Sequence, residues 1–135
     1  KYEAGTPNIA DTIALKNALD FIGKIGKATI RKHETDLLAY ATTQLESIPG
    51  LTIMGKAPEK VSLISFVIKN MHPQDIGVLL DNQGIAVRTG HHCTQPLMRR
   101  LGIPGTVRAS FAMYNTRQEV DKLVAGLQKA IKMLS

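Results

Sequence analysis

The first third of the chain has apolar residues at helical spacing and predicts two helices. Asn8, a residue type that caps helix N-termini, precedes an apolar series that continues to Ile22. Gly23 and Gly26 are expected to break or bend this helix, because glycine costs about 1 kcal/mol against alanine in a helix interior. A second apolar series at residues 29–48 predicts another helix, which ends at the turn signal "PG".

The middle of the chain changes to the pattern of strands. Short β-branched apolar runs at residues 51–54 and 61–68 predict two strands. Pro73 suits the first turn of a helix that ends before Gly84. Strand character returns in "IAVR" at residues 85–88, and a polar loop is expected to follow it.

The last part of the chain predicts a short helix at residues 96–102, a strand at 106–111 and a long final helix. Thr116 and Glu119 form a capping box at the start of that helix. An apolar stripe at helical spacing then predicts its core-facing side, namely Val120, Leu123, Val124, Leu127, Ile131 and Leu134. Together the elements predict an α/β domain with helices packed on a small sheet.

Composition and charge narrow the class of protein. The chain has 135 residues, of which 44% are hydrophobic and 21% charged, as in one globular domain. One cysteine excludes an internal disulfide framework, and no run reaches the roughly 18 apolar residues of a membrane span, so we expect a reducing, cytoplasmic location. The net charge of +6 is spread along the chain, and with few aromatic residues it does not predict nucleic-acid binding. The first residues lack an initiating Met and a secretory pattern, and we expect a fragment of a longer protein.

The segment "RTGHHC" at residues 88–93 carries candidate chemistry. Zinc is disfavoured, because adjacent side chains of an extended segment point to opposite faces and no second cysteine exists. A reactive thiol at Cys93 is favoured by the cationic candidates Arg88, His91 and His92, since such groups stabilise a thiolate. A lone cysteine is also often a small buried hydrophobic residue, which the polar neighbours argue against. Spacing alone leaves a reactive thiol and an inert surface cluster open.

Arg108 lies within the strand-like segment "TVRASF". It either points to solvent or, at the same sheet edge as the cysteine, binds a small-molecule carboxylate through two parallel hydrogen bonds. Cysteine and arginine together suggest a small amino or keto acid as substrate.

Two segments resemble a known family. "AVRTGHHCTQPLMRRLGIPGTVRASFAMYNTRQEVDKLV" closely resembles the C-terminal segment of group II, SufS/CsdA-like cysteine desulfurases, and "YEAGTPNIADTIAL" resembles the stretch that opens it. The resemblance implies the small C-terminal domain, with a mainly antiparallel sheet, of a fold-type I enzyme of the aminotransferase class V type. It implies a linker and the start of a long helix at residues 1–25 and a compact domain at 26–135, without the large domain that binds pyridoxal 5′-phosphate.

The resemblance also implies roles for individual residues. Cys93 would be the nucleophile that takes sulfur from L-cysteine as a persulfide and leaves L-alanine. Arg108 would hold the substrate carboxylate, and Arg88 would line the same pocket. His92 would tune proton transfer.

Gly5 and Thr6 match residues that reach the cofactor phosphate of the neighbouring subunit in a homodimer, although "GTPN" also serves as a turn into a helix. The family's Schiff-base lysine follows a histidine, and no lysine of this chain does. We therefore expect the chain alone to be inactive. Thr94 stands where the family has a smaller alanine, with no expected consequence.

The short cysteine loop resembles the group II form, which implies a SufE-like or SufU-like acceptor protein and sulfur supply for iron-sulfur cluster assembly. Selenocysteine lyase shares the same pocket and stays an alternative. A non-enzymatic module that binds an acidic protein or nucleic acid is a third interpretation. No metal is expected.

Overall fold

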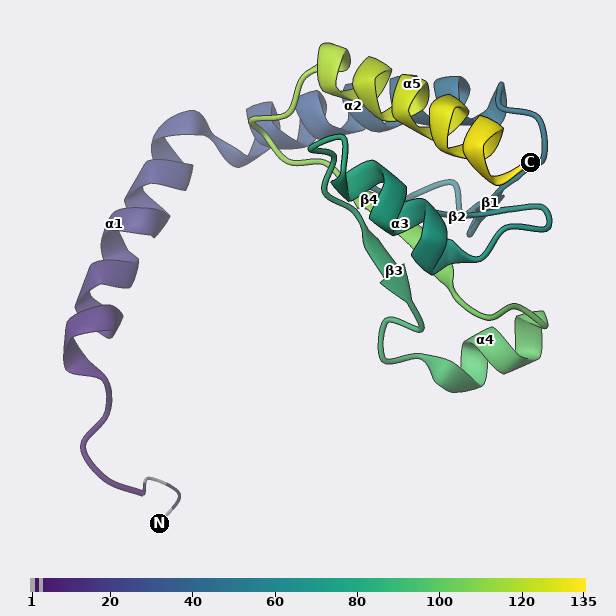
Figure 1. The fold of residues 1–135 in the computed structure, drawn as a ribbon. Helices are drawn as coiled ribbons and strands as arrows, with labels where there is room; N and C mark the ends of the chain where they lie inside the picture. Colours follow the sequence, from purple (N-terminus) through teal and green to yellow (C-terminus); the bar gives the residue numbers. More distant parts are fainter. Residues whose placement is uncertain (1, 3) are drawn as a thin grey trace. The chain divides into compact units, whose positions relative to one another are not determined.

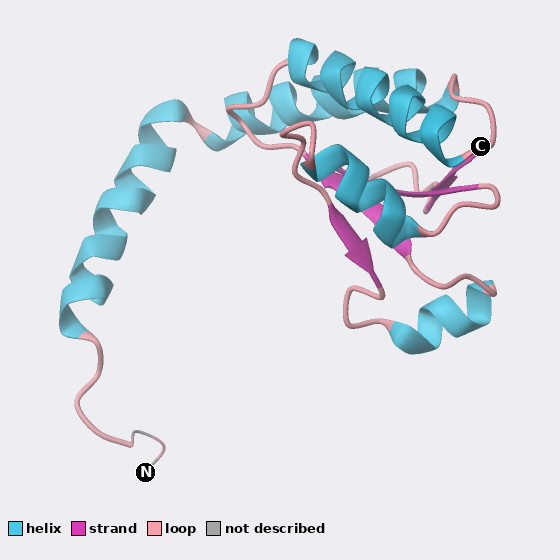
Figure 2. Ribbon diagram, in the orientation of Figure 1, coloured by secondary structure: helices cyan, strands magenta, loops and turns pink. Residues whose placement is uncertain are grey.

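The computed structural model describes Tyr2 and residues 4–135. Contacts between residues divide the chain into a unit that ends at His33 and a second unit, Glu34–Ser135. Within the described residues, the helices are α1 (Ile9–Ile25), α2 (Lys27–Glu46), α3 (Pro73–Asp81), α4 (Gln95–Leu101) and α5 (Arg117–Leu134), and the strands are β1 (Leu51–Met54), β2 (Leu63–Ile68), β3 (Arg88–Gly90) and β4 (Thr106–Ser110) (Figure 1; Figure 2). The order of elements confirms the predicted α/β class.

The unit that ends at His33 contains α1. Asn8 is its N-cap, as predicted, because its side chain accepts a hydrogen bond from the amide of Asp11. The predicted break falls at Gly26, which has a φ of 88°, whereas Gly23 lies inside the helix. The expectation for Gly23 was wrong because the cost of one interior glycine, about 1 kcal/mol, does not end a helix whose other residues favour it. None of the residues Ile9–Ile25 is buried.

The sheet of the second unit has the strand order β1-β2-β4-β3, and every neighbouring pair is antiparallel. This topology confirms the small antiparallel sheet that the family resemblance implied. Along β2, buried residues alternate with partly buried ones, which is the period of a strand with one face on the core. β2 begins at Leu63 rather than at Val61, which is 76% exposed.

β3 lies further along the chain than predicted. The expected strand covered residues 85–88, but the observed ladder pairs Arg88–Gly90 with β4. The reason is Gly105, whose backbone lies so close to Gly90 that an added Cβ would be 2.8 Å from the Gly90 carbonyl oxygen. This approach extends the pairing to the Gly90–Thr106 position, so the loop begins only at His91.

The core lies between the sheet and the helices of the second unit. α5 begins with the predicted capping box, in which the Thr116 side chain and Glu119 bond each other's backbone amides. α2 and α5 run side by side (Figure 1), and the Tyr40 hydroxyl donates to Asp121 at 2.6 Å. Fully buried apolar residues come from helices and strands alike: Leu45, Ile64, Phe66, Ile76, Leu80, Val107, Val120 and Leu127.

The predicted stripe of α5 is confirmed at its buried positions Val120, Leu123 and Leu127. Val124 and Ile131 are partly buried and pack against the core. The prediction was wrong for Leu134, which is 39% exposed because it is the last residue of the helix.

Candidate functional site

The thiol loop, which we define as His91–Thr94, joins β3 to α4. Cys93 is exposed, so the interpretation as a small buried hydrophobic residue does not hold. His92 and Cys93 have φ values of 51° and 62°, in the left-handed region that costs about 1–2 kcal/mol for each residue with a side chain. Two such residues in succession require contacts that hold them.

One of these contacts closes the loop on itself. The amide of Thr94 donates to the carbonyl oxygen of His91 at 2.9 Å, and the Thr94 hydroxyl donates to the same oxygen at 2.7 Å. Gln95 then begins α4. The loop is therefore a short, internally bonded turn.

His92 makes a second contact, with β4. Its Nε2 lies 3.0 Å from the hydroxyl oxygen and 3.2 Å from the carbonyl oxygen of Thr106, which is 2% exposed. Burial of the ring lowers the pKa of His92, and the charge of Arg108 lowers it further, while Arg88 and His91 act more weakly in the same direction. The hydrogen bond to the Thr106 backbone acts in the opposite direction. His92 is therefore a neutral, anchored ring at neutral pH.

Arg88 and Arg108 lie directly opposite each other on β3 and β4, so their side chains share one face of the sheet. Arg108 is partly buried, and its Nε is buried without a hydrogen-bond partner. Among the residues that the structure describes, neither guanidinium forms an ion pair with a carboxylate. Opposed like charges and an unpaired buried donor both destabilise a fold, the latter by about 1–3 kcal/mol. Such an arrangement is typical of a site that binds an anion.

The structure thus brings together several residues that the sequence singled out. Arg88, His92 and Arg108 lie close enough for both arginines to influence the His92 pKa, and Cys93 follows His92 directly. Gly5 and Thr6 belong to the other unit, where both are exposed in the turn that leads into α1. This position confirms the interpretation of "GTPN" as a turn into a helix.

Thr106 is a site residue that the sequence did not reveal. A threonine at the start of a strand is common, because β-branched residues favour strands. Only the fold places its hydroxyl beside the histidine of a loop that precedes it by many residues. No local pattern in the sequence signals this contact.

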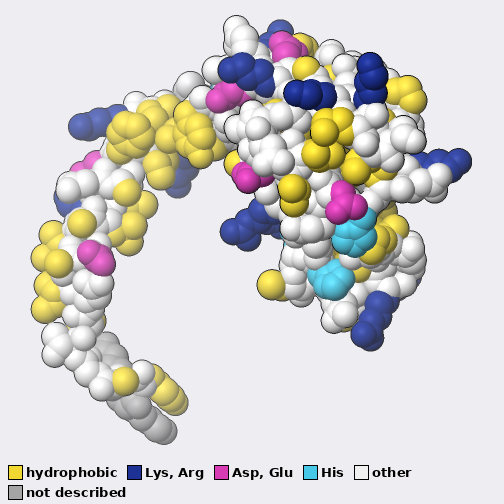
Figure 3. All heavy atoms as spheres, in the orientation of Figure 1, with side chains coloured by type: hydrophobic (Ala, Val, Ile, Leu, Met, Phe, Trp, Pro, Cys, Tyr) yellow, Lys and Arg dark blue, Asp and Glu magenta, His cyan; other side chains and the backbone are white. Residues whose placement is uncertain are grey.

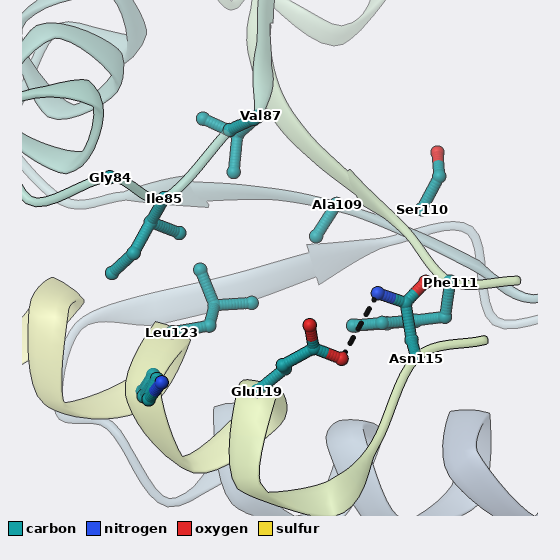
Figure 4. Close-up of a pocket in the computed structure, with 11 residues that line it drawn as sticks. Gly84, Ile85, Val87, Ala109, Ser110, Phe111, Asn115, Glu119 and Leu123 are labelled. Carbon is teal, nitrogen blue, oxygen red and sulfur yellow. Dashed lines mark hydrogen bonds between the residues drawn. The ribbon is translucent and has the colours of Figure 1, made fainter.

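A pocket of about 330 Å³ lies elsewhere in the second unit (Figure 4). Residues 84–87, the end of β4 and the first half of α5 line it, and none of the thiol loop does. Its one acidic side chain, Glu119, accepts hydrogen bonds from Thr116 and Asn115, and these bonds lower the pKa of Glu119. That carboxylate is therefore engaged in capping α5, and the other ionisable side chain that lines the pocket is Lys122.

The described part of the chain contains neither a metal-binding cluster nor a membrane-spanning helix. No group of three or more His, Cys, Asp or Glu side chains there has a geometry that could hold a metal ion. None of the helices in that part is long and apolar enough to cross a membrane.

The chain belongs to the aminotransferase class-V family, whose model matches residues 1–123. It is similar to the probable cysteine desulfurase of Xylella fastidiosa, with 45% identity over 99% of this chain and 32% of that protein. It is also similar to probable cysteine desulfurase 1 of Mycobacterium leprae, with 50% identity over 92% of this chain and 20% of that protein. The solved structure of the Escherichia coli cysteine desulfurase CsdA superposes with a TM-score of 0.89 at 37% identity, and covers 97% of this chain and 32% of that one.

These comparisons confirm the aminotransferase class-V family and the small α/β domain fold that the resemblance implied. The chain spans a third or less of the length of these three relatives.

Proposed function

We propose that the chain is the C-terminal domain of a pyridoxal 5′-phosphate-dependent cysteine desulfurase. The observation that carries the proposal is the unpaired, buried Nε of Arg108, which lies opposite Arg88 in the strand pair β3–β4, two positions before the end of β3 where the thiol loop begins. Similarity to cysteine desulfurases over nearly the whole chain supports it.

Arg108 and Arg88 bind the substrate in this proposal. A guanidinium presents its N–H groups in a rigid fork that matches a carboxylate through two parallel hydrogen bonds. The carboxylate of L-cysteine would satisfy the Arg108 Nε and offset the repulsion between the two opposed arginines. Ser65, which lies opposite Arg108 on β2, carries no charge that would compete for it.

Cys93 takes the sulfur. Its thiolate attacks the sulfur of bound L-cysteine, so that an S–S bond forms while the bond between Cβ and sulfur of the substrate breaks. The electron pair of the broken bond stays with carbon, which gains a proton and becomes the methyl group of L-alanine. One protein thiol and one L-cysteine thus give one protein persulfide and one L-alanine, and no external oxidant or reductant is needed because sulfur is oxidised as carbon is reduced.

The cofactor, when bound, supplies the electron sink for the charge that develops on the substrate carbon. Gly5 and Thr6 fit its phosphate, because both are exposed just before α1, where backbone amides and a hydroxyl favour an anion. We propose that they contact the phosphate bound by the neighbouring subunit of a homodimer. No lysine of the chain follows a histidine, so the Schiff-base lysine would belong to a large domain outside these residues, and the chain alone would be inactive.

The domain division follows the same proposal. We propose that residues 1–25 are a linker and the start of a long helix, that residues 26–135 are the compact domain, and that the rest of the complete protein is the large domain. In the structure α1 ends at Ile25, and the first unit ends at His33. The exposed apolar side chains along α1 support a large domain outside these residues (Figure 3), because exposed apolar patches of this kind mark surfaces that pack against another part of a protein. The length of the relatives leaves room for one.

We assign the protein to group II and propose a cytoplasmic role in iron-sulfur cluster assembly. The short thiol loop, closed by its own hydrogen bonds, supports this assignment, and so does the similarity to CsdA. A thiol on so short a loop delivers sulfur poorly over a distance. We therefore propose a SufE-like or SufU-like acceptor protein that comes to the loop.

The test uses the complete protein, purified with pyridoxal 5′-phosphate, and its Cys93→Ser variant. We expect L-alanine formation to fall at least about 100-fold and the persulfide on the peptide containing residue 93 to disappear, because a hydroxyl is a far weaker nucleophile than a thiolate. Mass spectrometry and alanine analysis measure both. Undiminished alanine and persulfide production in the variant would contradict the nucleophile.

Arg108→Ala tests substrate binding in the same protein. Loss of a charge-assisted pair of hydrogen bonds should raise the KM for L-cysteine by about 10- to 100-fold. Arg100→Ala is the matched control, since Arg100 is exposed on α4. Equal effects of the two variants would show that total charge matters and not the placement of Arg108.

A further inference from the structure

His92 is bonded to a buried residue of a neighbouring strand. Its Nε2 contacts both the hydroxyl oxygen and the carbonyl oxygen of Thr106, at 3.0 and 3.2 Å. A carbonyl oxygen only accepts hydrogen bonds, so this contact places the ring proton on Nε2. The nitrogen that faces Thr106 is therefore a donor to β4 and is not free to exchange a proton with the neighbouring thiol.

Thr106 is a firm anchor for such a bond. It is 2% exposed and pairs with Gly90, the last residue of β3. The backbone of Gly105 lies so close to Gly90 that only a residue without Cβ fits there. β3 and β4 are thus held together at Thr106, the residue that His92 contacts.

The thiol loop needs an anchor at this point. His92 and Cys93 both have left-handed backbone conformations, and the Cys93 side chain is exposed. Thr94 closes the far side of the loop on His91. The bond from His92 to Thr106 holds the residue before Cys93, and the bonds of Thr94 hold the residue after it. The backbone of Cys93 is therefore fixed on both sides.

We propose that His92 is a positioning residue that holds Cys93, through Thr106, in the conformation from which the thiol reaches the substrate. We propose this role in place of the proton-transfer role that the family resemblance implied for His92. It rests on the proposed desulfurase function, because it assigns the reason for the loop geometry to the attack by Cys93.

The experiment compares two substitutions in the complete protein. His92→Asn keeps a residue type that tolerates the left-handed conformation but is too short to reach Thr106. His92→Gln keeps an N–H donor at nearly the same reach and cannot titrate. The kcat and KM for L-cysteine are measured, together with hydrogen exchange of the Thr94 amide, which reports loop order without any catalysis.

We expect His92→Asn to lower kcat at least about tenfold with KM within about threefold, because a misplaced nucleophile loses rate more than binding. Exchange of the Thr94 amide should become at least about tenfold faster. His92→Gln should restore both quantities to within about threefold of wild type. Thr106→Val added to His92→Asn should cause little further loss, since both residues act through one bond.

Equal losses of kcat in the two variants, with Thr94 exchange at the wild-type rate, would overturn the proposal and return His92 to proton transfer. Unchanged kcat in His92→Asn would overturn it as well. If the wild-type protein forms no persulfide, the proposed function fails on its own. Hydrogen exchange of the Thr94 amide then still tests the bond between His92 and Thr106. Wild-type protection of that amide in His92→Asn would show that the bond does not order the loop.

Discussion

α1 and α5 are helices of nearly equal length, with 17 and 18 residues, and their surroundings differ completely. α5 gathers its apolar residues on one side and buries Val120, Leu123 and Leu127. α1 is the more apolar of the two in composition, yet none of its residues is buried. Apolar residues at helical spacing therefore predict a helix in both cases, but the pattern alone does not show which part of the protein packs against the apolar residues. Matched substitutions in the two helices measure this difference.

The largest difference is expected for leucine truncation. In the 135-residue chain, Leu127→Ala should lower the free energy of unfolding by about 2–5 kcal/mol, because Leu127 is fully buried. Leu19→Ala, at a position that is 60% exposed, should change it by less than about 0.5 kcal/mol. Urea titration measures both. Leu19→Ala should also lower the free energy of unfolding of the complete protein. No effect there would contradict the proposal that another part of the complete protein packs against α1.

Two helical glycines give the next comparison. A Cβ at Gly126 would lie 2.5 Å from Ile85 Cδ1 and 3.1 Å from Leu80 Cδ2, whereas nothing lies within 4 Å of one at Gly23. Gly126→Ala should therefore destabilise the chain by up to about 2 kcal/mol, because an overpacking cost of about 1–3 kcal/mol is partly offset by a gain of about 1 kcal/mol in helix propensity. Gly23→Ala should instead stabilise α1 by up to about 1 kcal/mol. Circular dichroism and urea titration check both signs, and a stabilising Gly126→Ala would show that this packing is loose.

The two N-caps form a smaller comparison. Thr116→Ala removes one half of the α5 capping box and should lower the free energy of unfolding by about 1 kcal/mol. Asn8→Ala removes the cap of α1 and should reduce amide protection in its first turn only. Hydrogen exchange separates a local from a global effect. A global loss with Asn8→Ala would mean that α1 unfolds together with the second unit.

The smallest effect concerns pH. The pKa of His92 is lowered in the folded chain, so the unfolded chain binds this proton more readily as the pH falls below the ordinary histidine value of about 6.5. The contribution of His92 to the free energy of unfolding is therefore full above that pH, and it is lost as the pH falls through the lower pKa of the folded chain. The urea midpoint of unfolding should therefore fall less between pH 7.5 and pH 5.5 in His92→Gln than in wild type. An equal fall in the two proteins would contradict a contribution of His92 to the pH dependence of stability.

Much of the fold follows from local sequence signals, and the exceptions have clear physical causes. Caps and apolar spacing predicted α5 and the start of α1, because both depend on residues within a few positions of each other. β3 was misplaced, because its end depends on the distant Gly105. The candidate site shows the same limit. Arg88 and Arg108 were singled out from their positions in strand-like segments, but their exact opposition and the Thr106 anchor arise only from strand pairing.

The exposed Cys93 also decides how this chain behaves during purification. It is the only cysteine of the sequence, so two copies in an aerated buffer can become cross-linked only through an intermolecular disulfide between their thiol loops. Such a species would elute as a dimer and would return to the monomer with reductant. Any self-association of the domain must therefore be measured with the thiol reduced or alkylated.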